Sequence, residues 1–361
     1  MNISPEFALL CEAARPDPDP EALGARLSST LDWPRLLELA LRHQIPVQLH
    51  QALRTRGEEE VPEFARRRLQ QLAQFIAIRN QRLVGELLRL LGVLEGQGIA
   101  AIPFKGPVLA WLAYGDLGRR PFADLDIFVP RHQMLAAHEL LLAEGYINQR
   151  PQRDFGRHSP RLLRSSYHYD EWYWKTLDER DLFGARVELH WATSPEHAIH
   201  PMEPEGLWAR RIILPLAGGQ VASFAPQDLF LLLCVNYSKD HWRYLRMVAD
   251  IVALWQRQAG LDWGLMLEQA RVLGRRRALL LAFALARDCL GATPPALIAA
   301  EMARDPVLPA LTQSVMWRLM RGGGDEPGPG NRILYNFRLR QGLANPWRYT
   351  LASLRKLLGE P

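Results

Sequence analysis

The sequence predicts an α+β protein in which a small mixed core of strands and helices is flanked by helical regions. Two long stretches, before residue 95 and after residue 223, repeat apolar residues at helical spacing. Between them, shorter segments alternate in the order strand, helix, strand, helix and strand. A chain of 361 residues is long enough for two or three compact units. We therefore expect an N-terminal helical region at 1–95, a core at 96–222 and a C-terminal helical region with a basic tail at 223–361.

The composition is ordinary for a soluble globular protein, with 48% hydrophobic and 23% charged residues. The longest apolar stretch, residues 278–286, is far shorter than the roughly 20 residues that a membrane span needs. The N-terminus lacks the basic start and apolar run of a signal peptide. Three widely separated cysteines fit a reducing compartment. We therefore expect a cytoplasmic protein without a transmembrane segment.

The net charge of +5 and a pI near 9.3 suit anionic ligands such as nucleotides or nucleic acid. Many proteins with this balance bind neither, so the charge alone does not decide the function.

Each predicted element has its own local signal. Residues 64–95 carry one long helical pattern in which apolar residues alternate with Arg and Gln. Residues 99–104 form a short apolar run that ends at a Gly-Pro break, and Pro107 suits the first turn of the helix that follows. ADLDIFVP and ARVELHWAT alternate like strands, and the helical pattern between them, at 132–145, closes at Gly145, a typical residue after a helix end.

Asp124 and Asp126 lie two residues apart on the predicted strand, so both side chains project from the same face. Two neighbouring carboxylates repel each other unless a cation neutralises them. Magnesium prefers carboxylate oxygens and leaves positions open for phosphate and water. Glu188 alternates against Val187 and Leu189 on another strand and is the best candidate for a third ligand. The alternative is a solvated strand face whose acids serve only solubility.

Basic residues flank the acidic pair and suit a triphosphate. Lys105 and Gly106 lie at the turn into a helix, where unpaired N–H groups and the helix dipole favour phosphate. Arg119 and Arg120 precede the acidic strand and can clamp phosphate oxygens. Each of these basic residues, considered alone, can equally be a surface charge.

Taken together, residues 104–146 (FKGPVLAWLAYGDLGRRPFADLDIFVPRHQMLAAHELLLAEGY) and VELHW resemble the bacterial nucleotidyltransferase-like family of the polymerase β superfamily. The later stretch LLLCVNYSKDHWRYLRMVADIVALW and the earlier HQIPVQLHQAL are similar to its C-terminal and opening helices. The resemblance covers about residues 30–260 and implies a polymerase β-like nucleotidyltransferase core.

The resemblance implies a role for each candidate residue. Asp124, Asp126 and Glu188 would hold Mg²⁺, with Mn²⁺ as an alternative, while Lys105, Gly106 and Arg120 would face the nucleotide. The implied activity moves a nucleoside monophosphate from an NTP such as ATP to an acceptor and releases pyrophosphate. The acceptor, whether a small molecule, RNA or protein, is not readable from the sequence, and neither is the oligomeric state.

Two departures from the family pattern favour an alternative function. Pro107 follows Gly106 where the superfamily usually has Ser or Gly, which removes a hydroxyl and an N–H that would hold phosphate. Asn236 stands where a His is expected. The chain could instead be a nucleotide-, RNA- or protein-binding module without turnover, or a purely structural protein.

Other polar residues carry open alternatives. His190 can orient Glu188 or contact substrate, or it can be a packed histidine. Lys239 and Asp250 can line the cleft or form a structural ion pair. The five arginines between residues 150 and 164 can contact an acceptor phosphate or lie in a solvated loop.

Overall fold

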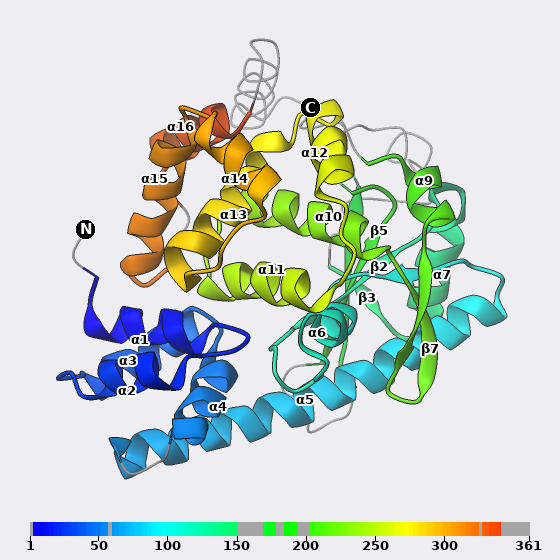
Figure 1. Cartoon of the computed structure of the whole chain (residues 1–361). Coiled ribbons are helices and arrows are strands. Elements are labelled where there is room, and N and C mark those ends of the chain that lie inside the picture. The colour runs from blue at the N-terminus through cyan, green and yellow to red at the C-terminus, as the bar shows by residue number, and fades with distance from the viewer. Residues whose placement is uncertain are drawn as a thin grey trace. The chain divides into compact units, whose positions relative to one another are not determined.

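The chain forms two compact units in the computed structural model, which describes residues 3–56, 60–149, 169–177, 184–193, 202–324 and 327–340 (Figure 1). One unit, called the helical unit below, combines the chain up to Ile78 with Leu112–Pro121 and the described residues from Phe230 onward. The other, called the sheet unit, combines Arg79–Trp111 with Phe122–Leu229. The division into regions 1–95, 96–222 and 223–361 stays a prediction.

The sheet unit is built on a five-stranded mixed sheet in the order β1-β2-β5-β4-β3. Its strands are β1 (Ile102–Pro103), β2 (Asp124–Phe128), β3 (Ile147–Asn148), β4 (Asp170–Lys175) and β5 (Ala185–His190). β2 and β5 run parallel in the centre, and the other pairs are antiparallel. Parallel neighbours bring the same end of both strands to one edge, so residues that are 62 positions apart in β2 and β5 lie side by side.

One face of this sheet is apolar because alternate residues of the central strands are apolar. Leu125, Ile127, Val187 and Leu189 are all at most 1% exposed. Tyr173 of β4 lies on the same face, opposite Val187 in the register, and no part of its side chain reaches solvent. This apolar face forms the core of the sheet unit. Its burial sets the orientation of the strands, so that the polar residues between the apolar ones point to the opposite face of the sheet.

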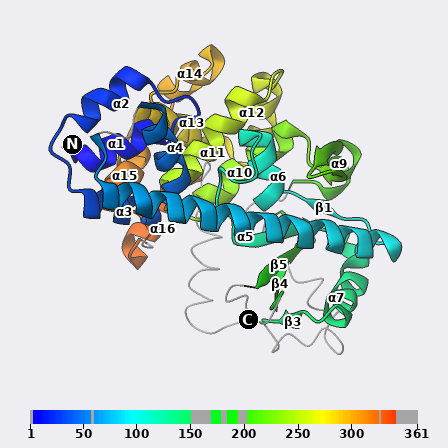
Figure 2. The same cartoon turned by 90° about the horizontal axis from the view of Figure 1, so that it is seen from below.

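Two helices pack beside the sheet in this unit. α7 (Met134–Ala143) contacts β4 through His138, whose Nδ1 lies 2.7 Å from the Tyr173 hydroxyl oxygen. α5 (Glu63–Gly96) is continuous over 34 residues, and its C-terminal part lies beside the end of α7 (Figure 2). Arg89 of α5 pairs with Glu144, and Tyr146 donates to Glu86 at 2.7 Å. Gly145, at φ +82°, lies just beyond the C-cap Glu144, as the sequence predicts.

A helix and a hairpin complete the sheet unit. α9 (Pro204–Ala209) precedes the antiparallel hairpin of β6 (Ile212–Leu216) and β7 (Gly219–Ser223), whose last strand contacts β1. Its two-residue turn has positive φ at both Ala217 (+49°) and Gly218 (+85°), which matches the twist of paired antiparallel strands. Arg210 clamps the buried Asp228 at 2.9 and 3.0 Å.

The helical unit contains helices from both ends of the chain. Its elements are α1 (Pro5–Ala13), α2 (Pro20–Leu27), α3 (Trp33–Arg42), α4 (Pro46–Arg56), α11 (Leu245–Arg257), α12 (Trp263–Val272), α13 (Arg276–Leu290), α14 (Ala296–Ala303), α15 (Leu308–Met320) and α16 (Pro329–Leu339). Local signals set several helix starts: Ser4, Asp19 and Asp32 cap α1, α2 and α3, and proline stands in the first turn of each. The helices α6 (Gly106–Tyr114) and α10 (Pro226–Lys239) begin in the sheet unit and end in this one.

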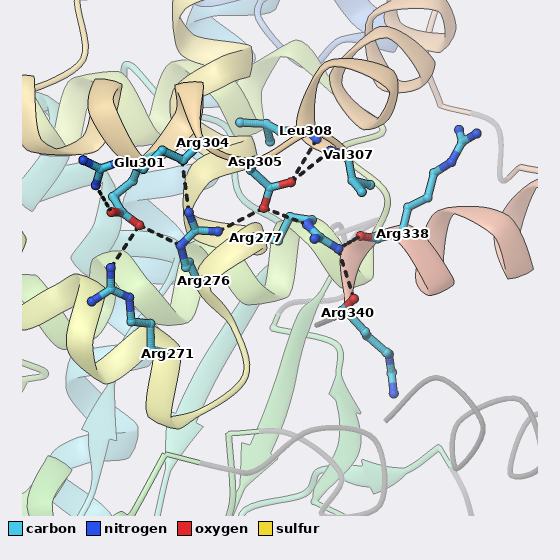
Figure 3. Close-up of polar contacts among 10 residues, drawn as sticks. All are labelled: Arg271, Arg276, Arg277, Glu301, Arg304, Asp305, Val307, Leu308, Arg338 and Arg340. Carbon is cyan, nitrogen blue, oxygen red and sulfur yellow. Dashed lines mark hydrogen bonds and ion pairs between the residues drawn. The ribbon is translucent and has the colours of Figure 1, made fainter. Parts of the chain in front are cut away.

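Two carboxylates tie the C-terminal helices together (Figure 3). Glu301 accepts hydrogen bonds from Arg271 and Arg276 at 3.0 and 2.9 Å, and Asp305 accepts from Arg276 and Arg277 at 3.0 Å each. Arg277 also donates to the carbonyl oxygens of residues 338 and 340 at the end of α16. These contacts connect α12, α13, α14 and α16. They also neutralise the buried carboxylates of Glu301 and Asp305, which are 6% and 4% exposed.

The predicted fold class is confirmed. The chain is a mixed α+β protein with a small mixed sheet, and helices precede and follow the strands of that sheet along the sequence. Among the described residues, none of the helices combines the length and the apolar character of a membrane span. The five arginines between residues 150 and 164 lie outside the described residues.

Candidate active site

The register of the central strands brings the acidic side chains together. In the parallel β2–β5 pair, Asp126 lies opposite Glu188 and Asp124 lies opposite Arg186. All four residues alternate against the buried apolar residues of the same strands and therefore share the other face of the sheet. The Asp126 side chain is 1% exposed, that of Glu188 is 13% exposed and that of Asp124 is 31% exposed. The three carboxylates thus form a cluster that runs from the buried interior toward solvent.

Lys105 neutralises the most buried acid. Its Nζ lies 2.9 Å from Asp126 Oδ1 and 5.2 Å from the centre of the Phe104 ring. Burial disfavours the Lys105 ammonium, but Asp126 and Glu188 outweigh this effect and raise its pKa above the ordinary value. Lys105 is therefore a fixed positive charge beside the carboxylates at neutral pH.

Gly106 allows the chain to pass close to β2. Its φ is +47°, and a Cβ atom at this position would lie 2.9 Å from the carbonyl oxygen of Asp124. Both the backbone conformation and the space favour glycine here. The Lys-Gly turn thus positions Lys105 by bringing its backbone against the acidic strand.

His190 is the third buried group of the cluster. Its Nε2 lies 3.0 Å from Asp126 Oδ1 and 3.8 Å from Glu188 Oε2. The ring packs edge-on against Phe104, with centroids 5.1 Å apart, and the residue is 5% exposed. His190 therefore contacts Asp126 directly, and its hydrogen bond orients that carboxylate.

Arg186 is a site residue that the sequence analysis did not single out. Its Nη2 lies 2.9 Å from Asp124 Oδ2 and 2.8 Å from Glu188 Oε1, and its guanidinium lies over the Trp172 ring. The available signal was strand alternation, because Arg186, Glu188 and His190 share one face of β5. Only the register with β2 makes it a bridge between two carboxylates.

The pKa values of Glu188 and Asp126 are shifted in opposite directions, because only Asp126 is in direct contact with Lys105 and hydrogen-bonded by His190. Burial raises the pKa of Glu188 to about 7, and the charges of Asp126 and Asp124 act in the same direction. Burial would also raise the pKa of Asp126, but Lys105 and His190 hold it well below its usual range. The cluster therefore favours an ionised Asp126, while an added positive charge would favour ionised Glu188 as well.

The donor set suits a divalent cation. Asp126, Glu188 and His190 each offer one ligand atom, and these atoms lie within 4.8 Å of one another. Carboxylate oxygens suit Mg²⁺ and Mn²⁺, and an imidazole nitrogen is also accepted by Mn²⁺ and other transition metals. The chemistry of the site thus fits a metal ion, with Asp124 available as a further oxygen ligand at the exposed side.

Arg119 and Arg120 belong to the helical unit and contact other groups there. Arg120 is 4% exposed, and its Nε donates to Asp250 Oδ1 at 2.9 Å. Arg119 donates to the carbonyl oxygen of Pro16 at 2.9 Å and lies over the Tyr114 ring. A nucleotide-facing role for these two arginines stays a prediction.

Asp250 forms the centre of a buried hydrogen-bond network rather than an exposed charge. It is fully buried and accepts from Arg120, Arg246 and the hydroxyls of Tyr114 and Tyr237 at 2.7–3.1 Å. Of the two alternatives left open for Asp250, the structure has a structural ion pair, which Asp250 forms with Arg120 and Arg246. Asn236, at the position where a His was expected, is 8% exposed.

Of the comparisons with known proteins, the match to a family model agrees with the resemblance of the sequence motifs. A solved structure of an antigenic nucleotidyltransferase-like protein from Paracoccidioides brasiliensis is similar at 15% identity, over 68% of this chain and 92% of that chain, with a TM-score of 0.35. No curated protein sequence matches the chain. A family model described as uncharacterised nucleotidyltransferase matches residues 29–291, which include β2, β5 and the Lys-Gly turn. Since this match spans most of the chain, the protein belongs to that family of uncharacterised nucleotidyltransferases.

Proposed function

We propose that the protein is a metal-dependent nucleotidyltransferase that moves a nucleoside monophosphate from an NTP to an acceptor hydroxyl. The observation that carries the proposal is the parallel register of β2 and β5, which sets Asp126 beside Glu188 next to Asp124. Such a constellation of acids, with a lysine fixed beside it, suits the binding of a polyphosphate and its cation.

In the proposed site, Asp124, Asp126 and Glu188 hold Mg²⁺ or Mn²⁺, and His190 orients Asp126. A divalent ion bound there would offset phosphate charge and favour ionisation of the acceptor hydroxyl. Lys105 is positioned to hold a phosphate oxygen, and Gly106 keeps the backbone close to β2. Phosphate contacts by Lys105 and Gly106 are part of the proposal.

The proposed reaction balances without a further reactant. The acceptor oxygen forms a bond to the α-phosphorus, and the bond between that phosphorus and the bridging oxygen to the β-phosphate breaks. Pyrophosphate leaves, and the acceptor proton passes to solvent or to a nearby carboxylate. The residues of the cluster contribute by binding the charged groups and fixing their positions.

Asp126→Asn tests the proposal, with Glu139→Gln as the control because Glu139 is an exposed carboxylate on α7 of the same unit. The full-length chain is incubated with each α-³²P-labelled NTP, Mg²⁺ or Mn²⁺ and pools of small-molecule, RNA and protein acceptors. We expect metal-dependent release of pyrophosphate from the wild type and the control, and none from Asp126→Asn. Equal release by both variants would reject the proposed role of the cluster.

Metal binding is measured separately, because an unknown acceptor can hide activity. The rise in melting temperature on adding Mn²⁺ should be present in the wild type and the Glu139→Gln control, and lost in Asp126→Asn. Melting temperatures without metal show whether each variant is folded. A wild-type protein whose melting temperature does not respond to divalent ions would contradict the metal site itself.

A second candidate function is a nucleotide-binding module without turnover. Pro107 favours it because its missing N–H removes a donor from the turn that would hold phosphate. Lys105 and Arg186 favour it as well, because they already neutralise the acids. Calorimetry with each NTP and Mg²⁺ separates the two: binding without pyrophosphate release across the acceptor pools supports the module, and release supports the enzyme.

A further inference from the structure

The positive charge of the chain is concentrated in its C-terminal part. Residues 230–340 contain fifteen Lys and Arg against nine Asp and Glu, whereas the whole chain has a net charge of only +5. The residues up to 229 therefore contribute no net positive charge. A net positive charge on one segment suits an anionic partner of that segment.

Part of this charge surrounds the turn between α10 and α11. His241 and Trp242 adopt positive φ values of +59° and +53°, which non-glycine residues rarely take in succession. The turn is held by Arg318 of α15, whose Nη2 donates to the His241 carbonyl oxygen at 2.8 Å. The Trp242 amide donates to the Tyr237 carbonyl oxygen at 2.8 Å. The structure thus maintains a strained backbone that presents His241 toward α15 and α16.

Several cations gather at His241. Burial lowers the pKa of its imidazole to about 4, and the positive charges of Arg318, Arg332 and Arg243 act in the same direction. His241 also packs against the Tyr335 ring of α16, with centroids 4.8 Å apart, and the Arg318 guanidinium lies 5.6 Å from the centre of the same ring. Segments from α15, α16 and the α10–α11 turn therefore form one basic patch, which comprises His241, Arg243, Arg318, Arg321 and Arg332.

Within the described part of the chain, nitrogen atoms of Arg318 and His241 in the patch have no hydrogen-bond partner. Arg318 Nη1 and His241 Nε2 are both buried and unsatisfied. Leaving such a group without a partner costs about 1–3 kcal/mol. A phosphate oxygen accepts hydrogen bonds from guanidinium and imidazole N–H groups and supplies the negative charge that the surrounding arginines favour.

Aromatic side chains lie beside the cations. Arg321 stacks over the Trp317 ring at 4.2 Å from its centroid, and Trp317 is 49% exposed. Trp317 and Arg318 precede Arg321 by four and three positions at the end of α15, the spacings at which side chains on a helix are neighbours. Cations beside an exposed aromatic ring are the combination that binds phosphates and stacks an unpaired base of a single strand.

We propose that this basic patch binds single-stranded nucleic acid, with phosphates along the patch from His241 and Arg318 to the exposed Arg321 and a base stacked on Trp317. The cations alone would also suit a duplex or an anionic membrane. The half-exposed tryptophan favours a strand with unpaired bases, because bases in a duplex are not free to stack on a side chain. Every residue of the patch lies in the helical unit, so the inference does not depend on the proposed transfer reaction.

The double variant Trp317→Ala/Arg321→Gln tests the proposal, because both side chains are exposed and neither holds the α10–α11 turn. Arg304→Gln is the control, since it removes the same charge from an arginine whose side chain is 73% exposed outside the patch. Binding is followed by fluorescence anisotropy of labelled 20-nucleotide RNA and DNA single strands, without NTP or metal, at several salt concentrations. Circular dichroism confirms that each variant is folded.

We expect the double variant to bind single strands roughly ten- to a hundredfold more weakly than the wild type, because it loses one stacking contact and one phosphate contact. The slope of log affinity against log salt should fall by about 0.7, the value for one phosphate contact on a single strand. The control should bind like the wild type. Comparison of the RNA and DNA strands identifies which sugar is preferred.

Three results would overturn the proposal. The double variant could bind single strands as tightly as the control. The wild type could bind a matched duplex more tightly than a single strand. It could also bind vesicles with anionic headgroups and show no binding to either strand. The Asp126→Asn variant should bind nucleic acid normally, so failure of the transfer reaction and failure of this inference give different results.

Discussion

Removal of Arg186 should strengthen the binding of divalent cations at the acidic cluster. The guanidinium bridges Asp124 and Glu188 at 2.9 and 2.8 Å, so it occupies carboxylate oxygens that a metal ion would use. Its side chain is 37% exposed, and solvent-exposed ion pairs are worth about 0.2–1 kcal/mol each. Two such pairs compete with the metal by up to about 2 kcal/mol in total, which corresponds to a change in affinity of up to roughly thirtyfold.

The Arg186→Met variant keeps most of the side-chain volume and removes the charge. Isothermal titration with Mn²⁺ at pH 7.5 should give a dissociation constant about two- to thirtyfold lower than that of the wild type. The metal-free variant should melt at a lower temperature, because the neighbouring carboxylates lose a neutralising charge. Arg211→Met is the matched control, since Arg211 is exposed in the same unit and donates to a backbone carbonyl oxygen.

An unchanged or weaker Mn²⁺ affinity of Arg186→Met would refute this reasoning. Such a result would mean that the three carboxylates are not the metal ligands, or that Arg186 orients them for the ion. A similar gain in the Arg211→Met control would also contradict it, because the effect would then come from net charge and not from the bridge.

Three further predictions concern buried groups. Asp250→Asn should destabilise the protein by about 3–5 kcal/mol, because the buried Arg120 and the partly buried Arg246 lose their counter-charge; urea denaturation measures this, and a loss below about 1 kcal/mol would contradict it. His43 is fully buried with its pKa lowered by burial to about 4, and its Nδ1 accepts from the Leu245 N–H at 3.2 Å. Because unfolded histidine titrates near pH 6.5, the contribution of His43 to stability should fall by about 3 kcal/mol as the pH drops from 6.5 to 4; the slope of stability against pH should be shallower in His43→Gln, where His241 alone of these two histidines still contributes, and an equal slope in both proteins would refute the assignment. Gly106→Ala should lower the melting temperature and weaken Mn²⁺ binding, since its methyl group would press on the Asp124 carbonyl; an unchanged titration would refute that coupling.

Several elements could be predicted because their signals are local. The long helical pattern at 64–95 appears as α5 (Glu63–Gly96), and the alternating runs appear as β2 and β5. The run at 99–104 is reduced to β1 at Ile102–Pro103, since only these residues pair with β2. β4 and the β6–β7 hairpin were not anticipated, because DEWYWK in β4 does not alternate cleanly between polar and apolar residues and Pro215 interrupts the apolar run of β6.

The sequence by itself determined which side chains share a face. Alternation puts Asp124 with Asp126 on β2 and Glu188 with His190 on β5, and the Lys-Gly turn follows from its position before a helix. The residues of each such group lie a few positions apart, and the backbone geometry of a single strand or helix determines where their side chains point.

Only the tertiary structure decided which charges meet. The parallel register of β2 and β5 sets Glu188 beside Asp126 and makes Arg186 a bridge between acids 62 and 2 residues away. Arg120 pairs with Asp250, 130 residues along the chain. The strengths of such pairs depend on distance and burial after folding, and both are set by how distant segments pack rather than by the local order of residues.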